Sequence, residues 1–286
     1  MTWRAFGVLL AALLLGPAAA GATTPTRRPL IVTQQNHALA DAEDCQRFHT
    51  STITSLPHSA RSEEKKDVRL ETSKHLTVKM GSEGGVSVRG WDRPFARLTV
   101  CKSAVALTAE QARRALARID VAVTRDEIIA RGPEPDETQT WWVNMILWVP
   151  RTAHLDLTAT NGGIAIRGMT SHVTARATNG GISIAGCAGE HHLETKNGGI
   201  SIDKVSGSVH AVTEAGPISL KLRDLIVPPL EAITDEQGEI YCNLKNCSDG
   251  RGDWAANRKR LRIGGQSVPS IRLTSLSADI MIAQVR

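Results

Sequence analysis

The chain has 286 residues, of which 22% are charged, and a formal net charge of +5. The basic residues are dispersed, and some of them, such as Lys65 and Lys66, stand beside acidic residues. Because nucleic-acid binding requires a concentrated basic face, this pattern argues against a nucleic-acid partner. The sequence also contains no phosphate-binding loop, nucleophile elbow or zinc-protease helix, so we expect neither enzymatic activity nor a cofactor.

Residues 1–22 have the pattern of a secretory signal peptide. Arg4 supplies the positive charge, residues 6–15 are an apolar run too short to span a bilayer, and small residues around Ala20 suit a cleavage site. We expect no transmembrane segment after signal removal. The predicted location is therefore the periplasm, the cell envelope or the extracellular space.

The five Cys residues are consistent with export to an oxidising compartment. Cys242 and Cys247 are close enough in sequence for a turn to join them, and this is the disulfide we consider first. Cys45 and Cys101 could tie the N-terminal segment to the body, which would leave Cys187 unpaired. The pairing is a hypothesis, because spacing alone does not determine connectivity.

Two regions precede the repeats. Residues 23–75 are polar, with few apolar runs, and predict a loosely ordered N-terminal arm. Residues 76–150 predict a capping unit of strands with one helix over residues 109–119. That helix is expected because Thr108 and Gln111 form a capping box before a run with apolar residues at helical spacing.

The last predicted strand of the capping unit covers residues 141–149. Apolar side chains occupy both alternating sets of positions, which is typical of a strand covered on both faces. Trp141, Trp142 and Trp148 lie on this strand, where packing in the core is favoured over stacking on a sugar.

An 18-residue repeat between residues 157 and 222 is the most informative feature of the chain. Residues 160–164, with the sequence Thr-Asn-Gly-Gly-Ile, recur at 178–182 and 196–200 and decay at 214–218. A fixed short period with Gly at fixed places predicts stacked coils. The repeated corner residues are Asn161, Gly162, Gly163, Asn179, Gly180, Gly181, Asn197, Gly198 and Gly199.

Each repeat contains two pairs of apolar residues spaced two apart, such as Ile164/Ile166 and Leu155/Leu157, which predict two short strands per coil. The expected fold class is therefore all-β: a parallel two-sheet β-solenoid with about 18 residues per coil over residues 151–286, ending in irregular C-terminal rungs. We expect the Gly pairs to turn the chain through positive φ and the Asn side chains to stack as an amide ladder.

The sequence resembles a bacterial family of exported β-solenoid proteins named putative adhesins or a domain of unknown function. The resemblance rests on residues 84–92 (Gly-Gly-Val-Ser-Val-Arg-Gly-Trp-Asp), on the strand end 148–150 and on the Asn-Gly-Gly-Ile repeats, and it covers residues 76–286. It departs from the pattern at residues 215–217 and in the segment 242–266. The resemblance implies an exported binding or scaffolding protein.

The 18-residue register also predicts a polar outer face rich in histidine. These side chains have the parity opposite to the inward apolar residues and should lie on neighbouring rungs about 4.8 Å apart. The predicted set is His154, Asp156, His172, Glu190, His192 and His210. Imidazoles at that spacing could share a Zn²⁺, Ni²⁺ or Cu²⁺ ion or gain charge as the pH falls toward about 6, but an exposed polar face on which His is merely tolerated is the favoured interpretation.

Three function hypotheses follow. The first is a non-enzymatic envelope or cell-surface protein, adhesin-like, that binds a protein or glycan ligand and could self-associate through the solenoid ends. The second is a periplasmic metal-binding or pH-sensing module that uses the histidine face, and the third is a degenerate carbohydrate-active enzyme. The tripeptide Arg251-Gly252-Asp253 matches an integrin ligand, but its polar, Gly-rich surroundings favour a plain turn.

Overall fold

The structure is a computed structural model, and the residues it describes lie in the compact unit Val32–Arg286. They are residues 44–45, 56–68, 75–81, 83–223, 228–235, 237–244, 247, 253–255, 258–264 and 270–284. The predicted signal peptide and most of the predicted arm lie outside these residues, as do Arg251 and Gly252 of the tripeptide. No helix in the described part of the chain is long and apolar enough to cross a membrane.

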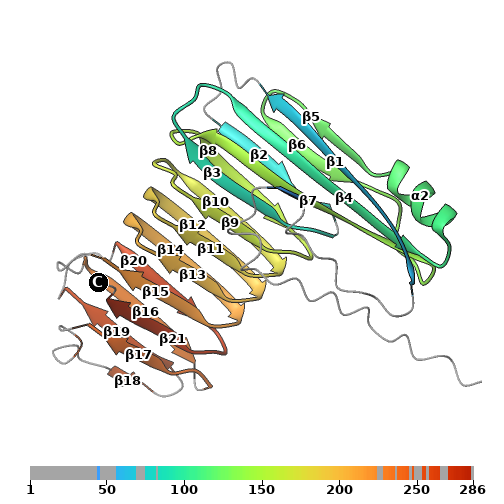
Figure 1. Ribbon diagram of the computed structural model, residues 1–286. Helices are drawn as coiled ribbons and strands as arrows, with labels where there is room; N and C mark the ends of the chain where they lie inside the picture. Colours follow the sequence, from blue (N-terminus) through green and yellow to red (C-terminus); the bar gives the residue numbers. More distant parts are fainter. Residues whose placement is uncertain are drawn as a thin grey trace, which may run out of the picture. The chain divides into compact units, whose positions relative to one another are not determined.

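The described residues form two large mixed β-sheets and one helix, α2 (Ala109–Ala117) (Figure 1). Sheet A contains, in spatial order, β1 (His58–Val68), β4 (Ala96–Ala106), β7 (Gln139–Pro150), β3 (Val86–Trp91), β9 (Ile164–Arg167), β11 (Ile182–Ala185), β13 (Ile200–Asp203), β15 (Ile218–Leu222), β21 (Ile280–Gln284) and β17 (Ile240–Asn243).

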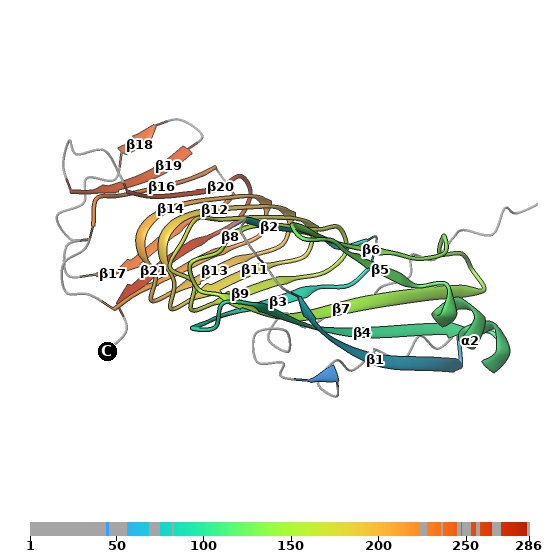
Figure 2. The ribbon, with the colours of Figure 1, turned by 90° about the horizontal axis from the view of Figure 1, so that it is seen from above.

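Sheet B contains, in spatial order, β18 (Asp253–Ala255), β19 (Arg258–Ile263), β16 (Leu230–Asp235), β20 (Ile271–Ser275), β14 (Ser206–Ala215), β12 (Ala188–Asn197), β10 (Val173–Asn179), β8 (His154–Ala159), β2 (His75–Lys79), β6 (Glu127–Arg131) and β5 (Asp120–Val123). Figure 2 shows β8, β12 and β14 of sheet B in one layer and β9, β11 and β13 of sheet A in the other.

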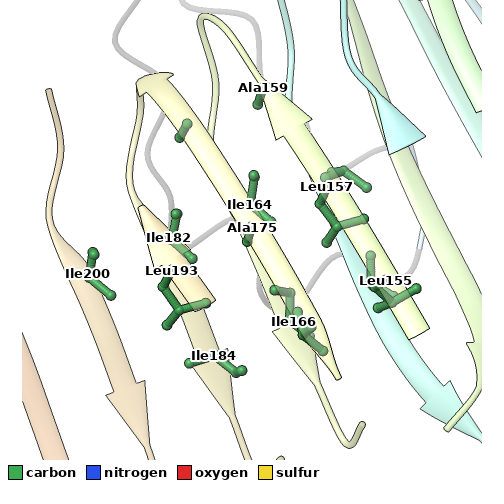
Figure 3. Packing of buried hydrophobic residues seen from close by; sticks show 14 of the residues in the cluster. Leu155, Leu157, Ala159, Ile164, Ile166, Ala175, Ile182, Ile184, Leu193 and Ile200 are labelled. Atoms are coloured by element: carbon green, nitrogen blue, oxygen red, sulfur yellow. The ribbon is translucent and has the colours of Figure 1, made fainter. Parts of the chain in front are cut away.

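In the repeat region all neighbouring strands are parallel and paired residue for equivalent residue. Ile182 lies between Ile164 and Ile200 in sheet A, and Ala175 lies between Leu157 and Leu193 in sheet B. The inward side chains of both sheets meet in one buried cluster, part of which is drawn in Figure 3. The core therefore lies between the two sheets and is continuous from one coil to the next.

Antiparallel pairs occur at both ends of the stack, and those at the C-terminal end correct the expectation of a parallel solenoid over residues 151–286. At the N-terminal side β4 pairs antiparallel with β1 and β7, and β5 pairs antiparallel with β6. At the C-terminal side β19 pairs antiparallel with β16 and β18. Short connections reverse the chain between β5 and β6 and between β18 and β19, whereas the other antiparallel partners are joined through intervening elements.

The segment that was expected to be loosely ordered contains a strand. Residues 58–68 form β1, which pairs over its whole length with β4. The sequence of β1 is rich in charge and gives no apolar alternation, because this strand lies at the edge of sheet A, where charged residues discourage further pairing. The helix differs little from expectation: Thr108 caps α2 and forms the capping box with Gln111.

The order of the last strands in the stack also differs from their order in the chain. Strands β20 and β21 from the C-terminal segment insert between the rung of β14 and β15 and the rung of β16 and β17. Residues 237–242 precede residues 279–282 in the chain, and the structure reverses that order in the stack. Pro229 has no N–H to donate, and its carbonyl accepts a hydrogen bond from the Ser270 N–H at 2.9 Å, which joins β16 to β20 at that end.

The repeated Gly residues are required by close backbone contact and not by positive φ. Gly162, Gly180 and Gly198 are absent from the positive-φ residues. A Cβ at Gly180 would lie 2.1 Å from the carbonyl oxygen of Gly162, and one at Gly198 would lie 2.3 Å from that of Gly180. Positive φ does occur at Gly84 and Gly216, in the degenerate copies of the corner. The corners thus need Gly because adjacent coils touch there through their backbones.

Side-chain amides link the same corners. Asn197 Nδ2 donates to Asn179 Oδ1 at 2.9 Å, and Asn179 Nδ2 donates to Asn161 Oδ1 at 2.8 Å. Asn161 Nδ2 in turn donates to Glu83 Oε1 at 2.9 Å. Burial raises the pKa of the Glu83 carboxyl, and the bond from Asn161 opposes that rise. The amide ladder therefore ends on a carboxylate at the N-terminal side of the stack.

The disulfides join Cys45 to Cys101 and Cys242 to Cys247, the two pairs considered from the sequence. Cys187 is a buried free thiol whose pKa is raised by burial. Its Sγ accepts from the Met169 N–H and donates to the Ala185 carbonyl, each at 3.4 Å. A thiol that is buried and held in this way is poorly reactive.

Substitution Gly180→Ala tests the corner contact. The added Cβ meets backbone that cannot rotate away, so we expect the free energy of unfolding to fall by about 3 kcal/mol. Gly186→Ala is the matched control, because Gly186 has positive φ but no atom within 4 Å of its added Cβ, and it should cost only about 1 kcal/mol. Chemical denaturation of both variants is the measurement, and equal losses would contradict the contact explanation.

Candidate functional site on the outer face of sheet B

The predicted histidine face lies on the outer side of sheet B, across β8, β10, β12 and β14. His154 and His192 are exposed, and His172 and His210 are half-buried. The pairing register places His192 beside His210, and Leu155 donates its N–H to the His172 carbonyl at 3.1 Å, next to His154. The side chains divide into two groups, one around His172 and one around His210.

The first group is a row that begins one strand earlier than the sequence indicated. His75 on β2 pairs in register with His154, whose ring centroid lies 6.4 Å from that of His172. His172 Nδ1 lies 3.4 Å from a carboxylate oxygen of Glu190. His75 was missed because β2 belongs to the capping unit, outside the 18-residue repeat, and only the strand pairing aligns it with the row.

The second group is the pair His192 and His210. Their rings meet edge to face with centroids 4.6 Å apart, and Arg272 follows His210 on the next strand. The pKa of His210 is lowered by burial and by the neighbouring His192 and Arg272, while Glu194 opposes the shift. Lowering this pKa favours the neutral imidazole, the form that binds a metal ion.

Two further carboxylates of this face, those of Asp156 and Glu194, lie near one cation. Arg176 Nη1 lies 3.4 Å from Asp156, and Arg176 Nε lies 3.7 Å from Glu194. Within the described ranges, no group of three or more His, Cys, Asp or Glu side chains could hold a metal ion. The predicted residues therefore share one face but form separate groups, and no single cluster contains them all.

One functional candidate was missed although the repeat contained its signal. His191 occupies the inward position taken by Val173 and Val209 in the adjacent coils, so its side chain enters the core. It is 1% exposed, and neither ring nitrogen has a hydrogen-bond partner among the described residues. Such a buried, unpaired imidazole destabilises the fold.

The surroundings of His191 keep its ring neutral. Burial, and to a smaller extent the neighbouring His172, lower the pKa of His191 to about 4, while Glu190 acts in the opposite direction. The unfolded chain takes up a proton near the ordinary pKa of about 6.5, whereas the folded chain does not until pH is near 4. The stability of the protein should therefore fall as pH falls through this interval.

Replacement of His191 with Leu tests this linkage. Between pH 6.5 and pH 4 the wild type should lose about 3 kcal/mol through this residue, and the His191→Leu variant should not lose that amount. Denaturation at pH 7, 5.5 and 4.5 measures the effect. His154→Leu, which replaces an exposed imidazole, serves as the control, and identical pH dependence in both variants would show that His191 is not the cause.

Comparisons with known proteins show remote likeness only. No protein-family model matches the chain, and no curated protein matches its sequence. The chain is similar in structure to a putative cell adhesion protein from Clostridium sporogenes ATCC 15579, at 12% identity and a TM-score of 0.41, covering 79% of this chain and 100% of that one.

Two further structures are more distant. A putative adhesin from Bacteroides fragilis NCTC 9343 has 10% identity and a TM-score of 0.33, with 78% of this chain and 97% of that chain covered. A putative lipid binding protein from Parabacteroides distasonis ATCC 8503 has 8% identity and a TM-score of 0.23, with 79% and 97% covered. At these identities and TM-scores the likeness does not assign a function to this chain.

Proposed function

We propose that the chain is a non-enzymatic, exported envelope or cell-surface protein, in which stacked coils of about 18 residues form a rigid, adhesin-like β-solenoid for binding or scaffolding. The observation that carries this proposal is the equivalent-residue pairing of the repeat strands in both sheets. Each backbone position is tied to the coil before it and the coil after it, so the outer faces are held as fixed surfaces.

The outer face of sheet A supports a binding or spacing role. Its repeat row consists of small side chains in register, and large apolar side chains follow on β21 and β17. In order these residues are Ser183, Ser201, Ser219, Met281 and Tyr241, whereas Ala165, the first position of the row, is only 2% exposed and does not contribute to the surface. Tyr241 and Met281 are 53% and 45% exposed and pair in register, so they offer adjacent apolar carbon at this end of the face.

Export is supported by two features. The disulfides Cys45–Cys101 and Cys242–Cys247 are typical of proteins outside the reducing cytosol. Residues 1–22 have a signal-peptide pattern, although they lie outside the described residues. Both features agree with a location in the periplasm, in the envelope or outside the cell.

Protease treatment of cells that express the protein natively tests this function. We expect that the cytosol does not protect the protein from the protease. It should be digested either in intact cells or after the outer envelope alone is permeabilised. Digestion in intact cells, with a periplasmic marker preserved, would support display at the surface. Digestion only under conditions that also digest the periplasmic marker would favour an internal envelope scaffold. Survival of the protein together with a cytosolic marker would contradict export.

A second candidate function, metal binding, is favoured by the His192–His210 pair. Two imidazoles 4.6 Å apart on neighbouring parallel strands can approach one ion by small rotamer changes. Calorimetric titration of the protein with Zn²⁺ should give binding heat that is lost in the double variant His192→Ala, His210→Ala. His154→Ala is the control, and equal heats in the wild type and the double variant would contradict this candidate.

A further inference from the structure

The longest open edge of the two sheets belongs to β1. Sheet A ends in β1 on one side and β17 on the other, and sheet B ends in β18 and β5. Strand β1 has 11 residues, whereas β17, β5 and β18 have 4, 4 and 3. Among the residues that the structure describes, β1 pairs with β4 alone, so its other edge presents backbone groups that could accept a further strand.

Charges on β1 alternate in sign along the outer face of sheet A. Strand pairing places Glu63 beside Cys101, which lies outside the core cluster between the sheets. Positions two apart in a strand share one face. The outer positions of β1 therefore carry, in chain order, a positive, a negative, a positive and a negative residue: Arg61, Glu63, Lys65 and Asp67. Arg61 and Glu63 are exposed, and exposed side chains exchange one ionic contact for another at little cost.

This order of charges is complementary to itself in an antiparallel strand pair. In a two-fold dimer, opposite residues must lie on the same face, so the pair is centred on a residue that meets its own copy. Centring the pair on Glu64 sets Arg61 opposite Asp67 of the second copy. It also sets Glu63 opposite Lys65, and both contacts occur twice by symmetry. Moving the centre by one residue in either direction sets like charges opposite each other.

The contact of Glu64 with its own copy lies on the inner face, near cations. Glu64 pairs with Val100, whose side chain belongs to the core cluster. Within one copy, Lys102 Nζ lies 3.7 Å from the Glu64 carboxylate. Position 66 of the second copy, a Lys, stands diagonally across from Glu64, a distance at which opposite charges in neighbouring strands still interact. Cations from both copies thus accompany the two central carboxylates.

The charges of β1 also restrict which strand can be added. Charged side chains on an edge discourage pairing with apolar or unmatched strands, which is how natural sheets protect an open edge. That protection does not exclude a strand whose charges match, and a second copy of β1 is such a strand. Specific interfaces combine an attractive match with repulsion of other partners and other registers in this way.

We propose that two copies of the chain form a two-fold dimer by antiparallel pairing of their β1 strands. Backbone hydrogen bonds continue sheet A from one copy into the other, and the opposite charges of the outer face set the register. The two-fold axis is normal to the sheet, so the outer faces of sheet A point to the same side in both copies. The dimer goes beyond the proposed function, because the pairing requires neither export nor a ligand.

Charge reversal on β1 tests the dimer. Sedimentation of the purified full chain at increasing concentration should show a monomer–dimer equilibrium that weakens as salt is added. Glu63→Lys should raise the dissociation constant about tenfold or more, because a Lys then meets Lys65 at both symmetric contacts, and Lys65→Glu should have the same effect. Glu134→Lys makes the same change at an exposed loop position and is the matched control, which should leave the constant unchanged.

A mixture of the two single variants separates lost charge matching from damage to the fold. Copies with Glu63→Lys and copies with Lys65→Glu carry matched charges when paired with each other. The mixture should therefore form a heterodimer with nearly the wild-type dissociation constant, although each variant alone dimerises poorly. Failure of the mixture to recover, with both variants folded by thermal unfolding, would contradict the proposed register.

Oxidative cross-linking tests the register directly. In the proposed pair the two copies of position 64 are opposite, with Cα atoms about 4.5–5.5 Å apart, so Glu64→Cys should give a disulfide-linked dimer. The two copies of position 61 lie about 20 Å apart along the strands, so Arg61→Cys, the control, should not cross-link.

Three results would overturn the proposal: a monomer at every concentration, a dimer that Glu63→Lys does not weaken, or equal cross-linking through positions 61 and 64. A dimer of the second kind would be assigned to another edge, such as β17. Because none of these measurements depends on the location of the protein, the protease experiment tests the proposed function independently.

Discussion

Parallel backbone pairing between equivalent residues of successive repeats is the constraint on which the rest of the structure depends. It sets Ile182 between Ile164 and Ile200, and it brings the Gly corners so close that a Cβ at Gly180 would meet the preceding backbone at 2.1 Å. The apolar positions then form one continuous core between two sheets. Once the corner geometry is given, the orientation of each side chain in the repeat follows from its parity.

The same pairing turns sequence positions that are far apart into rows on a surface. On sheet B it aligns His75 with His154, and His192 with His210. On sheet A it joins Arg97, Trp148 and Arg89 across three strands. Any function of this chain that uses an outer face therefore depends on residues from several strands, and the strand pairing sets their spacing. His191 is an unfavourable consequence of the same strand pairing, because its position places an imidazole in the core.

The two ends of the stack are built differently from its middle. On the N-terminal side, the long antiparallel strands β1, β4 and β7 continue sheet A beyond the repeats, and the charged sequence of β1 forms the edge. On the C-terminal side, β20 and β21 enter ahead of β16 and β17, and β19 and β18 close sheet B with antiparallel pairs. Both solutions limit the exposure of an open sheet edge, which could otherwise pair with other chains.

Local patterns were sufficient for part of the fold. The period-two apolar pairs indicated the strands of the repeat region, the capping box at Thr108 and Gln111 indicated α2, and parity placed His154, His172, His192 and His210 on one face. A consistent application of the same parity would have placed His191 in the core. The role of Gly was predicted from the wrong cause, since φ preferences are visible in a sequence and contacts between coils are not.

The sequence by itself determined the all-β class, the repeat period and the inward and outward positions of each coil, because these depend on residues close together in the chain. Only the tertiary structure decided the antiparallel ends, the order of the last rungs, the alignment of His75 with His154 and the placing of Trp148 between Arg89 and Arg97. These features arise from pairing between strands that are distant in sequence. Which partner each of these strands pairs with depends on the sheet edge that the rest of the fold leaves open, and local sequence patterns do not indicate that edge.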